Sequence, residues 1–328
     1  MGGDAVNIGM IEASARRLDG HARVTPLLSS PFVDEIAGRR VLVKAEALQH
    51  TGSFKYRGAW SAISALSDNA LKTGVIAYSS GNHAQGIALA AKQHGIPAVI
   101  VMPADAPEVK IANTRTLGAE VVLYDRPGGE DRRVVGGRIA RERGLTLVNP
   151  YDDSQVIAGQ GSVGLEIAEQ AADEGVSEGD VLVCCGGGGL SSGVALALEA
   201  RAPGLRVRPV EPEMQDDVRQ SLVAGRIVAH GKPEVGLCDA ILTPAPGQIT
   251  FPILHRLCGP GLAVSDAEVK TAMRIAFERL KLVLEPGGAV AFAAALFRPD
   301  QVGGDAVIAI ATGGNVDMKA FARILAEG

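Results

Sequence analysis

The chain has 328 residues, of which 47% are hydrophobic and only 4% aromatic, and it contains 41 glycines. This length predicts about two domains, and the abundance of Ala, Val, Leu and Gly is typical of helices packed on parallel strands. The formal net charge of −5 excludes the strongly basic surface that nucleic acids and anionic lipids require, so neither is an expected partner.

The amino-terminal residues 1–24 lack the basic segment and apolar run of a secretory signal. No later apolar stretch approaches the length of a bilayer-spanning helix. We therefore expect a soluble, cytoplasmic protein that makes no contact with a membrane.

Alternating strand-like and helix-like segments predict repeated β–α units, and hence parallel sheets covered by helices. The first series has strand-like segments at 74–80, 97–103, 120–125 and 145–150, with helix-like segments at 84–95, 109–119 and 134–144. The second series has strand-like segments at 180–185, 205–212 and 305–311, with helix-like segments at 190–201, 266–284 and 288–297.

The predicted fold class is α/β with two domains, each an open, mostly parallel sheet covered by helices. The strand-like segment 39–47, "RRVLVKAEA", has no partner strand nearby in the sequence, so we assign it to the second series. The small domain at 57–150 would then be inserted into a large domain made of residues 1–56 and 151–328.

Lys55 lies in "HTGSFKYRGA", where small, hydroxyl-bearing and aromatic residues, Ser53, Phe54, Tyr56 and Gly58, stand beside it. An amine in a partly apolar pocket loses solvation of its charged form, so its pKa falls and it becomes a nucleophile or forms an imine. The plainer alternative is an ordinary lysine at the start of a helix.

A second unusual segment, "VLVCCGGGGLSSG", has four consecutive glycines between a buried strand and a helix: Gly186, Gly187, Gly188 and Gly189. Glycines let backbone N–H groups approach a ligand, and a helix N-terminus adds partial positive charge, so we expect this loop to bind a phosphate. No lysine follows the glycines, as it would in a nucleoside triphosphate loop.

A dinucleotide cofactor stays an alternative, because Glu211 ends the next strand about where a ribose-binding acid would stand. The segment "GQGSVG" at 159–164 matches G-x-G-x-x-G, but no clear strand precedes it, and its glycines could simply pack a helix. Lys55 and the glycine loop together favour pyridoxal 5′-phosphate, which needs an amine and a phosphate cradle. Phe54 adds the aromatic contact that suits the pyridine ring.

Five segments in the same order resemble the fold-type II pyridoxal-phosphate enzymes, in the branch of serine/threonine dehydratases and serine racemases. They are "SFKYRGA", "SSGNHAQGIALAAKQHGIPAVIVMP", "GGGGLSSG", "EPGGA" and "TGGNVD", and the resemblance covers nearly the entire chain. It implies the tryptophan synthase β-like architecture and a homodimer. It also implies cofactor-binding roles: Lys55 holds the aldehyde, Gly186–Gly189 cradle the phosphate, Asn82 contacts the ring 3′-oxygen, and Thr312 lies beside the pyridine nitrogen.

The predicted substrate site follows the strand-like segment 74–80 and begins a helix, where free N–H groups suit an α-carboxylate. Its residues are Ser79, Ser80, Gly81, Asn82 and His83. We expect Lys55 to take the Cα proton as general base, and the resemblance to racemases implies Ser80 as a second catalytic residue on the opposite face. For His83 we favour a packed residue over a catalyst, and a serine helix cap is the alternative for the whole segment.

Thr312 departs from the serine that is common in this family at its position. A hydroxyl, unlike a carboxylate, does not force the pyridine nitrogen to be protonated, so elimination competes well with transamination. The threonine keeps that chemistry, while its methyl group leaves the substrate range open.

The segment "EPEMQDD" resembles the divalent-cation loop of the serine racemase branch, with Glu211, the carbonyl of Gln215 and Asp217 as ligands. Hard oxygen ligands suit Mg²⁺ or Ca²⁺, and Mn²⁺ is a further option. Two solvated acids at a strand end are the alternative. Arg132 falls about where racemases carry an arginine near the distal end of the substrate, so it would bind a carboxylate of an acidic substrate, unless it is a plain surface residue.

The main hypothesis is a dehydratase that converts L-threonine or L-serine to a 2-oxo acid and ammonia by β-elimination. A serine racemase or a 3-hydroxyaspartate dehydratase is the alternative within the same fold, and a β-replacement enzyme fits the motifs less well. An NAD-dependent dehydrogenase using Glu211, or a non-catalytic binding protein that has kept the cofactor pocket, are the alternatives outside this class.

Overall fold

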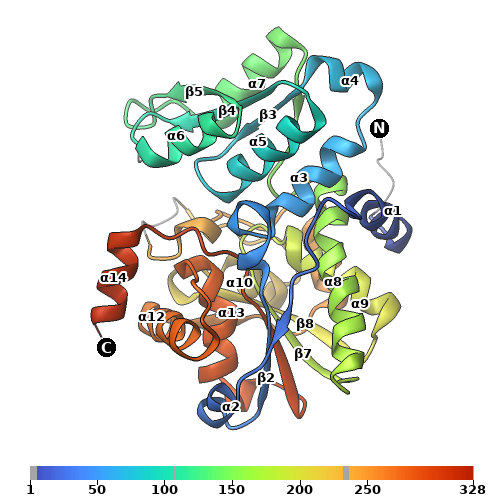
Figure 1. The fold of residues 1–328 in the computed structure, drawn as a ribbon, viewed down its shortest axis with the longest axis vertical. Coiled ribbons are helices and arrows are strands. Elements are labelled where there is room, and N and C mark those ends of the chain that lie inside the picture. Colours follow the sequence, from blue (N-terminus) through green and yellow to red (C-terminus); the bar gives the residue numbers. More distant parts are fainter. Residues whose placement is uncertain (1–5, 107, 232–235, 328) are drawn as a thin grey trace.

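The computed structural model of the protein describes residues 6–106, 108–231 and 236–327, whose strands form a large and a small sheet (Figure 1). The large sheet has the order β1-β2-β10-β7-β8-β9 and is parallel except for the pair β1 and β2. The small sheet, β5-β4-β3-β6, is parallel throughout. The strands are β1 Leu27–Leu28, β2 Arg40–Lys44, β3 Val75–Tyr78, β4 Ala98–Pro103, β5 Glu120–Tyr124, β6 Thr146–Leu147, β7 Gly179–Cys184, β8 Leu205–Pro212, β9 Leu262–Val264 and β10 Ala306–Ile310.

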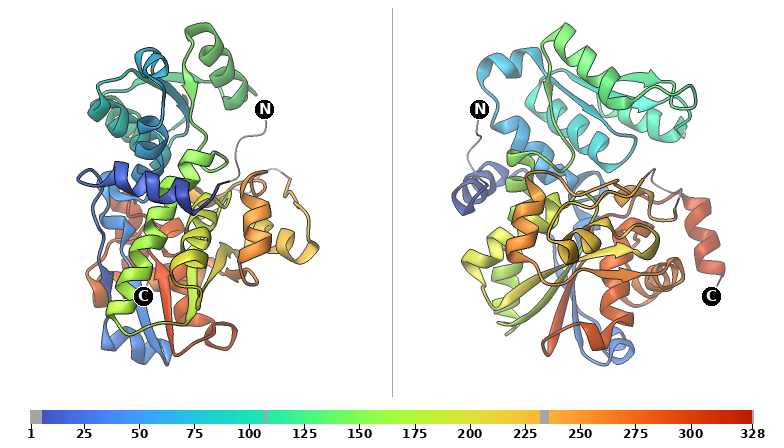
Figure 2. Two further views of the ribbon diagram at one scale, coloured as in Figure 1. Left: turned by 90° about the vertical axis from the view of Figure 1, so that its right-hand side faces the viewer. Right: turned by 180° about the vertical axis from the view of Figure 1, so that it is seen from behind.

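Helices cover both sheets, and Figure 2 shows the two sheets with their helices as two lobes stacked along the long axis of the molecule. The α-helices are α1 Ile8–Leu18, α2 Pro31–Ala37, α3 Lys55–Ser64, α4 Asp68–Thr73, α5 Asn82–His94, α6 Glu108–Thr116, α7 Arg132–Arg143, α8 Ser154–Asp173, α9 Gly189–Arg201, α10 Asp217–Ala224, α11 Thr250–Leu257, α12 Asp266–Ile275, α13 Pro286–Phe297 and α14 Met318–Ala326. Shorter helical turns are η1 Glu46–Leu48, η2 His50–Gly52, η3 Glu213–Gln215, η4 Asp239–Ile241, η5 Ala276–Leu280 and η6 Pro299–Gln301.

The strand β10 is buried on both of its faces. Val307 and Ala309 pack in a hydrophobic cluster with residues of α13, while Ile308 and Ile310 pack in another with residues of α8 and α9. A strand covered by helices on both sides needs an apolar residue at every position, which explains the continuous apolar run of β10. The predicted α/β fold class is confirmed.

The prediction that 39–47 joins the later strands is confirmed, because β2 pairs in parallel with β10. The small sheet and the helices α4 to α7 lie within the proposed inserted segment 57–150. The division of the chain into domains at those residues stays a prediction.

The prediction of one helix over 266–284 is wrong at its end. The helix α12 continues into the π-helical turn η5, and Lys281 then adopts a left-handed φ of 58°. A left-handed residue turns the following backbone away from the helix axis and so ends the helix.

The segment 159–164 lies inside α8, where its glycines allow other elements to approach closely. A Cβ at Gly159 would lie 2.6 Å from the carbonyl oxygen of Arg57, and one at Gly161 would lie 2.7 Å from the side chain of Ile11. The packing explanation for these glycines is confirmed, and the dinucleotide motif is not formed.

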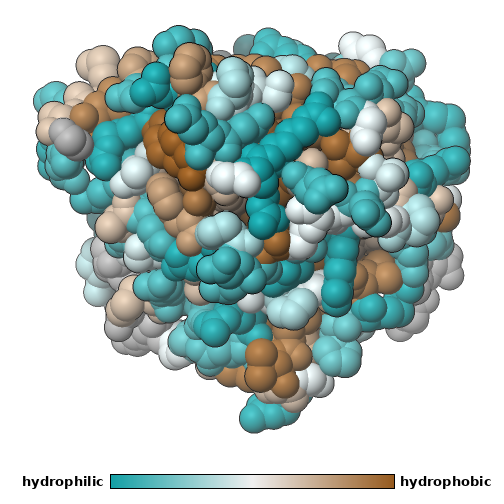
Figure 3. Space-filling model, turned by 90° about the horizontal axis from the view of Figure 1, so that it is seen from below, coloured by the Kyte–Doolittle hydropathy of each residue, from teal (hydrophilic) through white to brown (hydrophobic). Residues whose placement is uncertain are grey.

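Within the residues that the structure describes, every helix is too short or too polar to traverse a bilayer. On the face drawn in Figure 3, hydrophobic residues form small groups separated by hydrophilic ones. Scattered apolar exposure of this kind is usual for protein surfaces and identifies no partner.

Candidate active site

Lys55 occupies the first position of α3, and its amine is turned toward the segment that returns from the small sheet. The amine donates a hydrogen bond to the carbonyl of Pro150 at 2.8 Å and lies 5.0 Å from the centre of the Phe54 ring. Burial lowers the pKa of Lys55 to about 8, so a useful fraction of the amine is uncharged near neutral pH. This is the state that a nucleophile or base needs.

Thr312 lies two residues after the end of β10 and is buried beside the start of α3. The N–H of Phe54 donates to the carbonyl of Thr312 at 3.2 Å, and Ser53 forms a β-bridge with Gly313. These backbone contacts bring three predicted cofactor residues together: Phe54, Lys55 and Thr312.

The glycine loop connects β7 to α9, and its neighbours leave no room for larger residues. A Cβ at Gly187 would overlap the ring of Tyr151, a Cβ at Gly186 would lie 2.7 Å from the carbonyl oxygen of Ile241, and Gly188 has a φ of +91°. The first N–H groups of α9 have no acceptor within the helix, so together with its partial charge they form a seat for an anion.

Tyr151 joins the glycine loop to Lys55. Its ring lies against Gly187, and the preceding residue, Pro150, accepts the hydrogen bond from the Lys55 amine. The Lys55 amine and the glycine loop therefore contact two consecutive residues, Pro150 and Tyr151, although Lys55 and the glycines are far apart in the sequence.

The loop from β3 to α5 carries the predicted substrate residues. The N–H of Gly81 donates to the Ser79 hydroxyl at 3.2 Å, and Ser80 lies between them. The ring of His83 is buried, with Nε2 3.0 Å from the carbonyl oxygen of Val148. Burial, aided by the nearby Lys55 charge, lowers the pKa of His83 to about 3, so the ring is neutral and does not act as an acid.

The Asn82 side chain is held by two residues of the large sheet's lobe. Its Nδ2 donates to Glu285 Oε1 at 2.5 Å, and its Oδ1 accepts from Asn315 Nδ2 at 2.7 Å. Glu285 caps the start of α13, and its N–H donates to the carbonyl of Gly313. Asn82 is thereby brought close to Gly313, the residue that follows Thr312.

Sequence reasoning gave no role to Glu285, although it stands in the "EPGGA" segment. Burial raises the pKa of Glu285 to about 7, although the hydrogen bond from Asn82 favours the charged form. An acid directly before Pro-Gly-Gly, at the start of an entirely apolar helix, was the available signal. Tyr151 and Asn315 were missed because their partners are distant in the sequence.

Replacing Glu285 with glutamine is expected to stabilise the protein at pH 8 but not at pH 4. Between the ordinary glutamate pKa of 4.5 and about 7, the folded state keeps a proton that the unfolded chain has lost, so stability falls as the pH rises through that window. Glutamine stays neutral and still accepts from Asn82, so above pH 7 the variant gains roughly 1–3 kcal/mol. Urea unfolding at both pH values measures this gain, with the exposed Glu142→Gln as control. An equal difference at both values would contradict the assignment.

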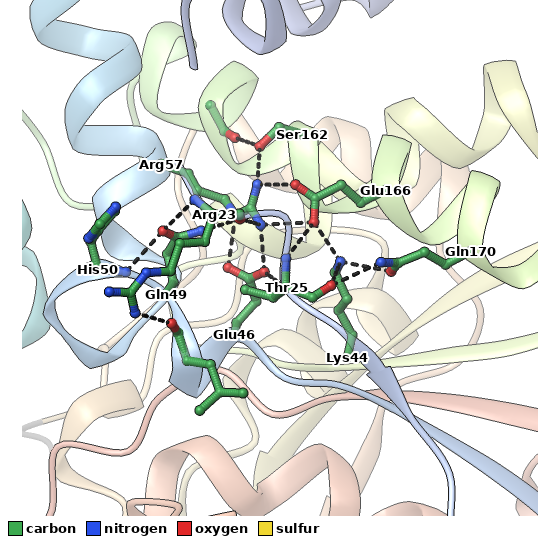
Figure 4. Close-up of polar contacts among 12 residues, drawn as sticks. Arg23, Thr25, Lys44, Glu46, Gln49, His50, Arg57, Ser162, Glu166 and Gln170 are labelled. Carbon is green, nitrogen blue, oxygen red and sulfur yellow. Dashed lines mark hydrogen bonds and ion pairs between the residues drawn. The ribbon is translucent and has the colours of Figure 1, made fainter. Parts of the chain in front are cut away.

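A buried ion-pair cluster, made of Lys44, Glu46, Arg57 and Glu166, fixes the start of α3 (Figure 4). Arg57 Nε donates to Glu46 at 2.8 Å, and Arg57 Nη1 donates to Glu166 at 2.6 Å. Burial opposes the charge of Glu46, but the positive charges of Arg57 and Lys44 keep the pKa of Glu46 below its usual value. Since Arg57 is two residues beyond Lys55, the cluster also fixes the backbone that carries Lys55.

Arg132 lies at the start of α7, with its guanidinium 5.7 Å from the centre of the Tyr78 ring. Tyr78 ends β3 and directly precedes Ser79, so Arg132 belongs to the same edge of the small sheet as the substrate loop. The side chain is exposed, and no hydrogen bond joins it to Lys55 or the glycine loop in the described residues. A role in substrate binding stays a prediction.

The proposed cation ligands lie between the end of β8, which contains Glu211, and the start of α10, which begins at Asp217. The Glu211 carboxylate accepts from the N–H groups of Val218 and Arg219 at 2.9 and 2.7 Å, and so caps α10. Burial raises the pKa of Asp217 to about 7, and its Oδ2 is buried without a hydrogen-bond partner. Burial and the nearby charge of Asp217 also raise the pKa of Glu211.

Among the described residues, no three His, Cys, Asp or Glu side chains form a group suited to a metal. The predicted set has only two such side chains and the carbonyl of Gln215. An unpartnered buried carboxylate oxygen beside a second buried acid fits a cation that supplies the missing positive charge.

An open α/β fold that brings a buried lysine and a four-glycine loop at a helix N-terminus to the same segment, Pro150 and Tyr151, is typical of an enzyme that holds a phosphorylated aldehyde cofactor. The family model "Pyridoxal-phosphate dependent enzyme" matches residues 18–313. The chain belongs to this family, which confirms the predicted family and cofactor.

Several known proteins are similar to this chain over almost its full length. It is 44% identical over 312 residues to an L-threo-3-hydroxyaspartate ammonia-lyase of Pseudomonas sp, covering 95% of this chain and 96% of the relative. It is 40% identical over 318 residues to a serine racemase of Schizosaccharomyces pombe, covering 97% and 96%. The crystal structure of a threonine deaminase from T.th. superposes with a TM-score of 0.89 at 43% identity, covering 95% of this chain and 99% of that one.

Both the main function hypothesis and its alternatives within the fold agree with these relatives, which are named ammonia-lyase, deaminase and racemase. The dehydrogenase alternative is wrong, because the family that matches this chain is a different one.

Proposed function

We propose that the protein is a pyridoxal-phosphate dependent ammonia-lyase of small hydroxyamino acids, with L-threonine and L-serine as its substrates. The observation that carries the proposal is the Lys55 amine, buried and with its pKa lowered to about 8, facing the Tyr151 segment that covers the glycine loop. Relatives named as ammonia-lyases support the reaction class.

The roles of the residues follow from their chemistry. When bound, pyridoxal phosphate supplies an electron sink for bond breaking at the substrate Cα. We assign to Lys55 the binding of the cofactor aldehyde and, when its amine is free, removal of the Cα proton. N–H groups at the start of α5 bind the α-carboxylate, and loss of the β-hydroxyl leads to a 2-oxo acid and ammonia.

Other parts of the proposal rest on the resemblance and on local geometry. Ser80 would act on the face opposite Lys55, which permits some racemisation. Glu211, the Gln215 carbonyl and Asp217 would hold Mg²⁺, Ca²⁺ or Mn²⁺, supported by the unpartnered Asp217 oxygen. The homodimer and the cytoplasmic location remain predictions.

A substrate panel tests the proposal. L-Serine, D-serine, L-threonine and both 3-hydroxyaspartate diastereomers are assayed with Mg²⁺ or with EDTA, and both 2-oxo acid and serine enantiomers are measured. We expect 2-oxo acid from L-threonine and L-serine, and a higher unfolding temperature with Mg²⁺ than with EDTA. Formation of D-serine without 2-oxo acid would favour the racemase, and the absence of any turnover would reject the enzyme.

A specific observation favours 3-hydroxyaspartate as a second candidate substrate. Arg132 lies over Tyr78 at the edge that carries the substrate loop, and an arginine there suits the second carboxylate of a dicarboxylic amino acid. A relative at 44% identity is named for that substrate.

Arg132→Ala is then expected to raise KM for 3-hydroxyaspartate about 10- to 100-fold, the effect of losing a charge-assisted hydrogen bond, and to leave KM for L-threonine unchanged. Its exposed neighbour provides the control, since Arg133 pairs with Asp131. Arg133→Ala should change neither value. Equal effects on both substrates would show that Arg132 does not bind the second carboxylate.

A further inference from the structure

Two donors fix the carbonyl of Gly187 in the glycine loop. Thr250 Oγ1 donates to this oxygen at 2.7 Å, and the N–H of Gly247 approaches it at 3.2 Å. The Thr250 hydroxyl also accepts from the N–H of Gly247 at 2.8 Å, and the whole residue is buried. The hydroxyl has a second acceptor in the carbonyl of Gly247 at 3.3 Å, but the Gly187 carbonyl at 2.7 Å is the nearer of the two.

The direction of this carbonyl determines where the next N–H points. In a planar trans peptide, the C=O of one residue and the N–H of the following residue point in opposite directions. Because the Gly187 carbonyl is directed at Thr250, the N–H of Gly188 is directed away from Thr250. That N–H belongs to the loop in which the anion seat is formed.

A run of four glycines needs such a restraint more than other loops do. Glycine lacks a Cβ, so its peptide units rotate between alternative orientations at little cost, and Gly188 already uses a φ of +91°. A Cβ at Gly188 would lie 3.1 Å from Thr250 Oγ1, so glycine is also what lets the two segments come this close.

Thr250 is itself fixed from other parts of the chain. It is the first residue of α11, and the Asp152 carboxylate accepts from the N–H groups of Gln248 and Ile249 at 3.0 and 2.8 Å. Ser192, on α9, donates to the Thr250 carbonyl at 3.3 Å. The position of Thr250 is therefore also set by contacts with Asp152 and Ser192, which lie outside the four glycines.

We propose that Thr250 is a positioning residue that fixes the Gly187–Gly188 peptide so that its N–H faces the phosphate of the cofactor. The inference rests on binding of pyridoxal phosphate and not on which amino acid is the substrate. Thr250 does not touch the cofactor, but acts through the Gly187 carbonyl.

The test compares cofactors with and without a phosphate. Enzyme freed of cofactor is titrated with pyridoxal phosphate and with pyridoxal, for the native protein, Thr250→Val and Thr250→Ser. The valine variant keeps the shape without the hydroxyl, and we expect its Kd for pyridoxal phosphate to rise about 5- to 20-fold. Its Kd for pyridoxal should change less than about twofold, and the serine variant, which keeps the hydroxyl, should resemble the native protein.

A merely structural role would weaken the binding of both cofactors alike, and that result would overturn the proposal, as would an unchanged Kd for pyridoxal phosphate in the valine variant. If the valine variant does not fold, Thr250→Ala removes the hydroxyl and carries the same comparison. Binding is measured without turnover, so a wrong substrate assignment does not affect the outcome.

Discussion

Lys55→Ala is expected to lower kcat by at least about 10³-fold with every substrate that the native enzyme converts, because the variant loses its general base and the amine that holds the cofactor aldehyde. The visible absorption of the lysine-bound cofactor, which borohydride bleaches in the native enzyme, should be absent. Steady-state kinetics and absorption spectra measure the two effects.

Lys92→Ala provides the matched control, since Lys92 is an exposed lysine on α5. It should keep native kcat and the native spectrum. Lys55→Arg should be inactive too, because the guanidinium stays charged near neutral pH whereas the pKa of Lys55 is lowered to about 8. A Lys55→Ala variant that retained a tenth of native kcat would refute the assigned role.

Glu46→Ala is expected to give the largest loss of stability, about 3–5 kcal/mol, because it removes a fully buried carboxylate and leaves the buried Arg57 without that partner. Glu46 accepts from both Nε and Nη2 of Arg57, each at 2.8 Å, and from the Thr25 hydroxyl at 2.5 Å (Figure 4). Without this carboxylate, Arg57 and Lys44 must share Glu166. Urea unfolding at pH 7 measures the loss.

Glu46→Gln separates charge from packing, because it keeps the size of the side chain and should show most of the loss. An exposed pair provides the control: Arg138 and Glu142 lie four residues apart on α7 with more than half of each side chain in solvent. Glu142→Ala should change stability by less than about 0.5 kcal/mol. A loss below about 1 kcal/mol for Glu46→Ala would show that the cluster does not hold α3 in place.

Local pattern predicted much of the fold because each strand and helix of the series carries its own periodicity. It failed at 266–284, where the apolar pattern continues past Leu280 but the backbone turns at Lys281. The turn places Leu282 and Leu284 in the largest hydrophobic cluster, a contact with distant parts of the chain that the pattern of the segment does not reveal.

In the candidate site, too, local sequence pattern revealed some residues and missed those whose contacts are distant in the sequence. Lys55, Asn82 and the glycine loop stand in recognisable segments, so they could be proposed as site residues from the sequence. Glu285 meets Asn82 across 203 residues, and Thr250 meets Gly187 across 63. Such partners come together only through the order of strands in the sheets, which no single segment encodes.

The hydrogen bond from Lys55 to Pro150 joins the two points where the chain leaves for the small sheet and comes back from it. Ser79–His83 and Arg132 all lie on that excursion, whereas Gly186–Gly189, Glu285 and Thr312 lie outside it. With the substrate and cofactor roles that we propose, genetic recombination at these two adjacent crossover points would combine the amino-acid preference of one protein with the cofactor site of another. A chimera of this kind would take Lys55 from one parent and its substrate selectivity from the other.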